Sequence, residues 1–183
     1  MVSEAQMTQD ALALGATHAA LISTENIAVL DEVRMLCAQN QCGRYGTNWM
    51  CPPGCGELDA CEKEIHSFAK GLLIQTVGFV EDFADFEGYA RIHKEHDQHC
   101  KAIFARFKEE YKPGRMLCLS AGGCSICPQC TYPTGEPCRF PDKAVSSLEG
   151  YGMVVNQLVT SAKLAYNNGP NSVSYVGLVL FEA

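Results

Sequence analysis

The chain has 183 residues and a net charge of −7, with 14 Lys and Arg against 21 Asp and Glu. Its basic residues form no cluster, and because nucleic-acid binding depends on clustered Lys and Arg, the composition argues against a nucleic-acid partner. The longest apolar stretch, residues 72–80, is far too short for a membrane helix, so we also expect no membrane partner.

Cysteine is the most informative residue of the composition, with eleven copies in the chain. Residues 1–8 lack the basic and then apolar segments of a signal peptide, so we expect the protein to remain in a reducing cytoplasm. Disulfides are rare in that compartment, and clustered cysteines are more often metal ligands or catalytic thiols. Cysteine-rich loops of this kind can need their metal to become ordered.

The N-terminal part of the sequence predicts two helices with a strand between them. Apolar residues recur at helical spacing over residues 3–14. Residues 18–22 are typical of a short buried strand, and His18 at its start is expected to be structural. A short helix is predicted over 27–35, with Thr24 placed to cap it.

The first cysteine loop follows, over residues 37–61. It holds five cysteines: Cys37, Cys42, Cys51, Cys55 and Cys61. Its glycines and prolines predict irregular backbone, and a loop with so many cysteines needs something to organise it. An iron–sulfur cluster, in addition to the one that the later cysteine loop would hold, would do so. The first three cysteines are the preferred ligands, with the fourth ligand from one of the other two or from the later cysteine loop. Cys61 best fits the alternative of a free buried thiol, because it falls inside a helical pattern over 57–70.

A strand, a long helix and another strand are predicted between the two cysteine loops. Residues 72–80 are apolar and partly β-branched, and we expect this strand centrally in the sheet. An apolar stripe predicts a helix over 83–111. Residues 115–120 form the next strand, in which Cys118 alternates with leucines and is expected to be a core thiol.

The long helix also carries a group of histidines. Helical spacing places His93, His96 and Cys100 on neighbouring turns of one face, whereas His99 lies off that face. One interpretation of this face is a mononuclear metal site. Packed or solvated histidines are the commoner outcome at such spacing.

The second cysteine loop, residues 122–141, has the most specific spacing in the chain. Cys124, Cys127 and Cys130 form the C-x2-C-x2-C run with which bacterial ferredoxins hold three corners of a [4Fe-4S] cluster. The fourth ligand would be Cys138 or a cysteine of the first loop. Structural zinc sites usually join two separated C-x2-C pairs, so the spacing favours iron–sulfur over zinc, which stays as the alternative metal.

After the second loop the pattern predicts helices over 143–149 and 153–166 and a closing strand over 172–181. The order of the elements implies an α/β or α+β fold. We expect one domain over residues 1–183, with a central sheet of about four strands flanked by helices and with both cysteine loops as connections.

Several of these motifs resemble those of the DUF2284 family of predicted metal-binding proteins. The matching elements are Cys37 and Cys42 followed by Tyr45-Gly46, then Cys51-Pro52-Pro53, Gly123-Cys124-x2-Cys127-x2-Cys130, Pro137-Cys138-Arg139-x-Pro141-x-Lys143-Ala144 and Ser147-x-Glu149-x2-Gly152. The resemblance covers most of the chain, although the first cysteine pair of the family is usually spaced more closely than here. It implies metal or iron–sulfur binding and supplies no reaction.

The first function that fits these observations is a redox protein that holds one or two [4Fe-4S] clusters and passes single electrons to a redox partner protein. One ligand set would be Cys124, Cys127, Cys130 and Cys138. The candidates for the other set are Cys37, Cys42, Cys51 and Cys55. Arg139, next to a ligand, would lower the cost of adding negative charge, unless it is an ordinary surface arginine.

Two other functions fit the same sequence. One is an enzyme whose cluster has only three cysteine ligands and an open iron for the substrate, with Glu149, Lys143 and His96 as candidate acid or base groups. The other is a zinc-stabilised scaffold without a redox role.

Overall fold

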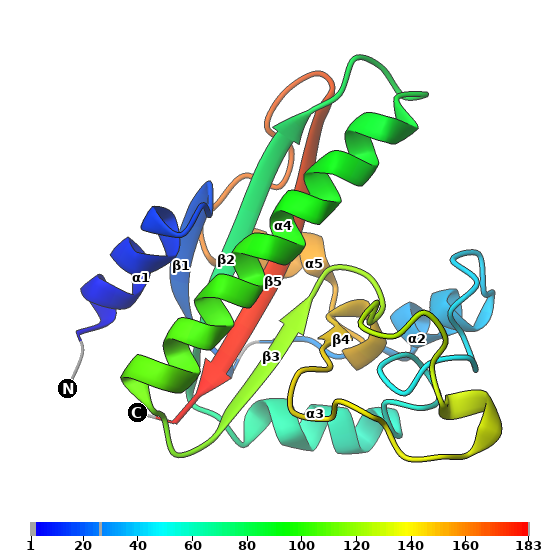
Figure 1. Cartoon of the computed structure of the whole chain (residues 1–183). Helices are drawn as coiled ribbons and strands as arrows, with labels where there is room; N and C mark the ends of the chain where they lie inside the picture. The colour runs from blue at the N-terminus through cyan, green and yellow to red at the C-terminus, as the bar shows by residue number, and fades with distance from the viewer. Residues whose placement is uncertain (1–2, 26, 183) are drawn as a thin grey trace.

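The computed structural model describes residues 3–25 and 27–182 (Figure 1). Across these residues the chain forms one five-stranded mixed sheet and five α-helices. The strands are β1 (His18–Ser23), β2 (Lys70–Phe79), β3 (Met116–Ser120), β4 (Ser146–Ser147) and β5 (Ser172–Phe181). The helices are α1 (Glu4–Ala13), α2 (Asp31–Ala38), α3 (Leu58–His66), α4 (Phe86–Arg106) and α5 (Val155–Ser161). The predicted class of mixed helices and sheet is confirmed, with the two-residue β4 added to the strands that the sequence predicts.

The strands lie in the order β1-β2-β5-β3-β4. β2 and β5 pair antiparallel along their whole lengths, from Lys70 opposite Phe181 to Phe79 opposite Ser172. β1 pairs with the other edge of β2, and β3 joins only the last part of β5, from Leu178 onward. The strand expected in the centre, β2, is therefore interior, but β5, the third of the five strands, occupies the middle position.

Both faces of the sheet are covered by helices, so the side chains of the inner strands are buried on alternate sides. Leu72 and Ile74 of β2 belong to the core beneath α1 and α4, whereas Leu73 belongs to the core beneath α3 and α5. Val179 and Leu178 of β5 divide in the same way. Figure 1 shows α4 in front of β2 and β5, and α5 behind them. Burial on both faces explains why these strands are continuous apolar runs in the sequence.

Two helices begin later than the local sequence signals predict. The helix expected over 27–35 is α2, which is displaced toward the C-terminus because the hydroxyl of Thr24 donates to the carbonyl oxygen of Phe68 instead of capping a helix. The helix expected over 83–111 is α4 followed by a π-helical turn, and its start is fixed by Asp85, whose carboxylate accepts a hydrogen bond from the first turn.

The prediction of a helix over residues 143–149 is wrong. Its middle residues form β4, which pairs in parallel with the end of β3, and the short 3-10 turn η3 (Glu149–Tyr151) follows. The hydroxyl of Ser147 accepts a hydrogen bond from the backbone N–H of Gly150, which favours this turn over a continuous helix. The helix predicted over 153–166 is the shorter α5, because Lys163 adopts left-handed backbone just beyond its end.

Side chains of helix α4 pack directly onto two strand positions that lack side chains. A Cβ atom at Gly78 would lie 2.5 Å from Cγ1 of Ile92, and one at Gly177 would lie 2.6 Å from Sγ of Cys100. A larger residue at either position would push the helix off the strands. No helix in the described part of the chain, α4 included, has enough apolar length to cross a bilayer.

The histidines of α4 make hydrogen bonds within this packed layer. His96 is fully buried, with Nδ1 3.0 Å from Oγ1 of Thr76 and Nε2 3.4 Å from Oγ of Ser120. Nε2 of His93 lies 3.2 Å from the carbonyl oxygen of Ala121. Within residues 3–25 and 27–182, no three His, Cys, Asp or Glu side chains gather closely enough to hold one metal ion. These histidines are therefore packed and hydrogen-bonded, and their side chains do not form a mononuclear metal site with Cys100.

His96 makes the stability of the fold depend on pH. Burial lowers the pKa of His96 from its ordinary value of 6.5 to about 4. Between these values the unfolded chain binds a proton that the folded chain does not, so the stabilisation is fully present above pH 6.5 and is lost as the pH falls toward 4, by about 3 kcal/mol in total.

We expect the His96→Gln variant to lose this part of the pH dependence, because glutamine keeps a hydrogen-bonding side chain but does not titrate. Urea unfolding from about pH 7 to about pH 4 measures the effect. His66→Gln, at the exposed end of α3, is the matched control and should keep the wild-type profile. Parallel profiles for wild type and His96→Gln would contradict the assignment.

Candidate metal centre

The two cysteine loops lie against each other beyond the end of β3 (Figure 1). Neither contains much regular structure, so hydrogen bonds between them fix their positions. Nδ2 of Asn48 donates to the carbonyl oxygen of Cys124 at 2.9 Å, and Nε1 of Trp49 donates to the carbonyl oxygen of Glu136 at 3.0 Å. Residues far apart in the sequence are thereby held at one site.

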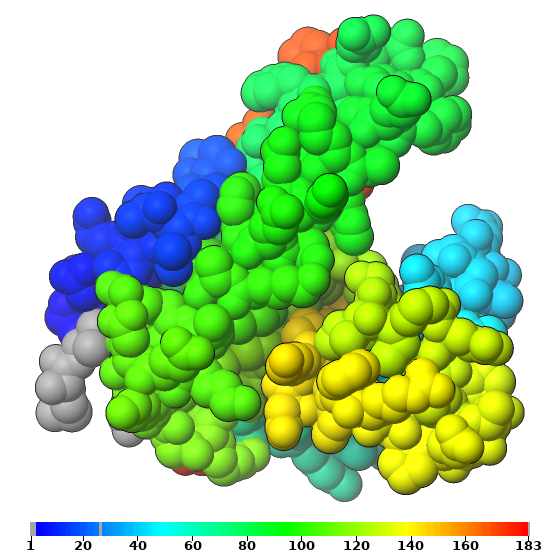
Figure 2. Space-filling model, in the orientation of Figure 1, coloured from blue at the N-terminus to red at the C-terminus, as the bar shows by residue number. Residues whose placement is uncertain are grey.

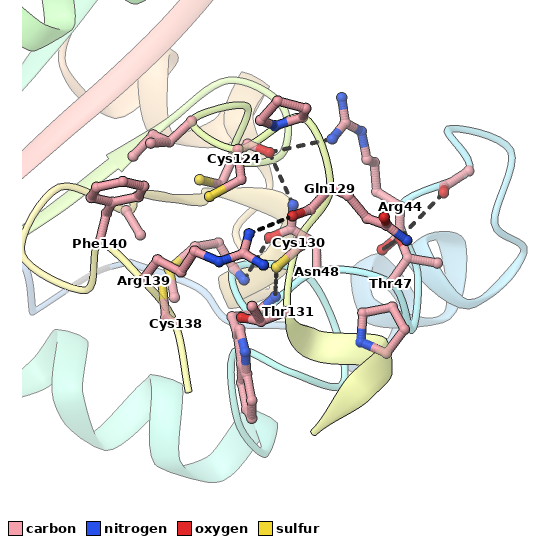
Figure 3. Close-up of a pocket in the computed structure, with 18 residues that line it drawn as sticks. Arg44, Thr47, Asn48, Cys124, Gln129, Cys130, Thr131, Cys138, Arg139 and Phe140 are labelled. Carbon is pink, nitrogen blue, oxygen red and sulfur yellow. Dashed lines mark hydrogen bonds between the residues drawn. The ribbon is translucent and has the colours of Figure 1, made fainter. Parts of the chain in front are cut away.

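A pocket of about 470 Å³ opens between the loops (Figure 3). It is lined by all four cysteines of the predicted ligand set: Cys124, Cys127, Cys130 and Cys138. Each of these thiols is partly buried, and none forms a disulfide. The structure thus brings together the C-x2-C-x2-C run and the one later cysteine that the sequence offers as its fourth member.

The fold of the second loop explains how Cys138 returns to the run. After Cys130 the chain makes a 3-10 turn and reverses at Gly135, whose φ of 72° is in the left-handed region. The hydroxyl of Thr131 donates to the carbonyl oxygen of Pro137 at 3.0 Å and closes this reversal. Cys138 consequently lines the same pocket as Cys130.

Backbone and side-chain donors surround the pocket. The backbone N–H of Trp49 donates to Sγ of Cys130 at 3.5 Å, which is the type of contact that stabilises a thiolate ligand. Arg44 donates from Nη1 to the carbonyl oxygen of Cys124 at 3.3 Å, and Arg139 donates from Nη1 to that of Gln129 at 3.1 Å. Over the residues that the structure describes, the pocket lining thus includes two arginines and no carboxylate, although the chain as a whole is acidic.

The cysteines of the first loop are divided between two surroundings. The thiols of Cys37 and Cys55 donate to the carbonyl oxygens of Glu149 and Gly150 in η3, at 3.9 and 3.5 Å. Cys61, which we expected to be a free buried thiol, is buried and donates to the carbonyl oxygen of Cys55 at 3.7 Å. These three cysteines form a group around η3.

Arg34 holds the η3 group together. Its Nε donates to the carbonyl oxygen of Gly150 at 2.6 Å, and Nη2 lies 3.6 Å from Sγ of Cys55 and 3.5 Å from Sγ of Cys61. The hydrogen bond with the Cys55 thiol and the nearby guanidinium lower the pKa of the Cys61 thiol. Burial and the neighbouring Glu149 raise the pKa of Cys37.

The other two cysteines of the first loop lie elsewhere. Cys51 is buried against the second loop, where a Cβ atom at Gly123 would lie 2.8 Å from its Sγ, and burial raises its pKa to about 11. Cys42 is exposed. Cys42 helps to raise the pKa values of both Cys37 and Cys51, and Cys124 helps to raise that of Cys51, so these thiols lie near one another. Among the described residues, neither these cysteines nor those of the second loop are gathered as tightly as a single-ion site requires.

The candidate acid and base groups occupy three separate surroundings. Glu149 is in η3 beside Cys37, and burial raises the pKa of its carboxyl. Lys143 borders a small groove of about 40 Å³ between α4 and the second loop, whereas His96 is inside the core under α4. The structure does not assemble these residues into one acid–base site.

Sequence reasoning missed Asn48, Arg44 and Arg34. The available signal was that three of the six arginines lie in or beside the cysteine loops. A buried asparagine gives no sequence signal of its own, because its role depends on a partner far along the chain.

The family model described as predicted metal-binding protein (DUF2284) matches residues 20–181. The chain belongs to this family. The matched range includes both cysteine loops and the strands that carry them, so the resemblance found in the motifs is confirmed over most of the chain. Comparisons with curated proteins and with solved structures found no match.

Asn48 provides a test of how the DUF2284 loops are held. It is only 4% exposed; besides donating to Cys124, it accepts a hydrogen bond from the backbone N–H of Met50 at 2.9 Å. Because Asn48→Ala leaves both groups without their partner, we expect it to lower the free energy of unfolding by roughly 1–3 kcal/mol. Asn156→Ala, at an exposed position of α5, is the control. Urea unfolding measures both, and equal losses would contradict a special role for Asn48.

Proposed function

We propose that this protein binds a [4Fe-4S] cluster through Cys124, Cys127, Cys130 and Cys138 and transfers single electrons to a redox partner protein. The observation that carries the proposal is that these four free thiols line one pocket. Their order in the chain, a C-x2-C-x2-C run with one later cysteine, is typical of iron–sulfur ligation.

The arrangement of the thiols supports a cluster over a single zinc ion. In a [4Fe-4S] cluster each cysteine binds a different iron, so the sulfurs surround a volume instead of converging on one atom. The four cysteines line the walls of a pocket of about 470 Å³, as a cluster that binds each of them through a different iron requires. This donor set fits the cluster.

The surroundings of the pocket suit a change of charge. A bound cluster supplies one-electron redox chemistry. The N–H of Trp49 on Cys130, together with the guanidinium groups of Arg44 and Arg139 at the pocket, favours added negative charge. The partial exposure of the thiols lets a partner protein approach the site closely.

The pocket supports one cluster, because it is lined by one set of four cysteines, while the neighbouring thiols of Cys37, Cys42 and Cys51 are the candidates for a second one. We also propose a reducing, cytoplasmic setting. All eleven cysteines are free thiols, including pairs that lie close together, and such thiols persist where disulfides are rare.

Metal analysis after anaerobic purification and reconstitution tests the cluster. We expect about four irons and matching sulfide per chain, a brown protein, and reversible bleaching of its visible absorption by one electron. Cys127→Ser should lose most of the iron and unfold at a lower temperature, because metal-binding free energy at such sites is also folding free energy. Cys118→Ser is the matched control, since this thiol packs against the core under α4 and should leave the iron content unchanged.

Two results would contradict the proposal. One is stoichiometric zinc with no iron after reconstitution, which would favour the structural scaffold. The other is an iron content that Cys127→Ser leaves unchanged.

A further inference from the structure

The arginines of the chain fall into two groups according to their partners. Three of the six pair with carboxylates: Arg91, Arg106 and Arg115. The other three belong to the cysteine-loop half and donate to main-chain carbonyls: Arg34, Arg44 and Arg139. No ion pair within residues 3–25 and 27–182 includes these three, although the chain has 21 carboxylates. The positive charges of these three arginines are therefore not neutralised by a carboxylate in an ion pair.

Two of these arginines, Arg44 and Arg139, line the cysteine pocket, and both are exposed. Each donates to one carbonyl oxygen, at 3.3 and 3.1 Å. A guanidinium has five N–H donors, so most of its donors stay available. Its planar fork matches carboxylate and phosphate groups, which it binds through two parallel hydrogen bonds.

The rest of the lining suits a small organic molecule. The volume of about 470 Å³ is within the range of about 300–1,000 Å³ that is typical of small-molecule sites, and a bound cluster would fill only the part next to the cysteines. Of the 18 lining residues, four are cysteines, and several others are apolar, among them Trp49, Ile126 and Phe140. Figure 3 shows the side chain of Arg139 extending from beside Cys138 toward Gln129, with the ring of Phe140 at the left of the view.

We propose that the pocket binds, beside the cluster, a small molecule with an apolar body and one oxyanion group, a carboxylate or a phosphate. Arg44 and Arg139 bind the oxyanion, and the apolar part packs against Trp49 and Phe140. This inference rests on the proposed function, because the cluster shares the pocket. The cysteines by themselves indicate only a site for the cluster, and the inference adds a site for a small molecule to the same pocket.

Trp49 provides the measurement. It is the single tryptophan of the chain, it lines the pocket, and it is held by its bond to Glu136 and by edge-on packing against Tyr132 at 4.9 Å. Inorganic phosphate, acetate and benzoate are titrated into iron-loaded protein under anaerobic conditions, and Trp49 fluorescence and calorimetry follow binding. A preference for benzoate over acetate indicates a carboxylate on an apolar body, and a preference for phosphate indicates a phosphate ligand.

We expect saturable binding of at least one probe to the iron-loaded protein. Arg139→Gln and Arg44→Gln should each raise the Kd about tenfold, because a charge-assisted hydrogen bond is replaced by a weaker neutral one. Arg91→Gln is the matched control and should leave the Kd unchanged, since Arg91 pairs with Glu95 on α4, away from the pocket lining. The iron content of every variant is measured in parallel.

The outcomes separate this inference from the cluster itself. An unchanged Kd in both pocket variants overturns the oxyanion site. The absence of saturable binding to iron-loaded wild type also overturns it. If the two pocket variants then lose iron as well, the arginines serve the cluster alone. If wild type takes up iron but binds the probe only in its iron-free form, the oxyanion site beside the cluster is also overturned, because the anion would then replace the cluster. Binding that the pocket variants weaken, in a wild type that takes up no iron, supports the oxyanion site and rejects the cluster.

Discussion

The candidate metal centre depends on the hydrogen bonds that join two irregular loops. Asn48 and Cys124 are 76 residues apart, and the amide of Asn48 connects them while also accepting from Met50. Each such bond contributes only about 1 kcal/mol net, but leaving a buried polar group unsatisfied costs about 1–3 kcal/mol. Asn48 therefore stabilises the arrangement in which the two loops meet, and the pocket lies between the loops in that arrangement.

The sheet supports this arrangement from one side. β3 pairs with both β4 and the end of β5, and it leads directly into the second cysteine loop after Ser120. Helix α4 rests closely on Gly78 and Gly177, and His93 contacts Ala121 at the start of that loop. The rest of the loop has no strand or α-helix to hold it. A bound metal would thus complete the packing of this half of the protein, which is why metal binding and folding are coupled at such sites.

Local patterns predicted the parts of the structure that depend on neighbouring residues. The strands β2 and β5 and the helix α4 follow from apolar runs and periodicity, and the three-residue spacing from Cys124 to Cys130 places its thiols in one pocket. The segment 143–149 was mispredicted because its serines pair with β3, a contact invisible to local propensity. The placement of the first-loop cysteines Cys37 and Cys55 likewise depends on η3, where Gly150 is 95 residues beyond Cys55 in the chain.

The placement of charge gives the two halves of the protein different chemistry. Around the sheet, arginines and carboxylates neutralise each other at the surface, where such pairs contribute little. Burial raises the pKa of Cys37, and the carboxylate of Glu149 raises it further. The hydrogen bond with Cys55 lowers the pKa of Cys61, and the guanidinium of Arg34 lowers it further, because a positive charge favours an ionised thiol. An acidic protein that must hold thiolates, a cluster or an anionic ligand therefore has to keep its carboxylates away from some arginines. The main-chain carbonyl partners of Arg34, Arg44 and Arg139 achieve this, because a carbonyl fixes the direction of a guanidinium without cancelling its charge.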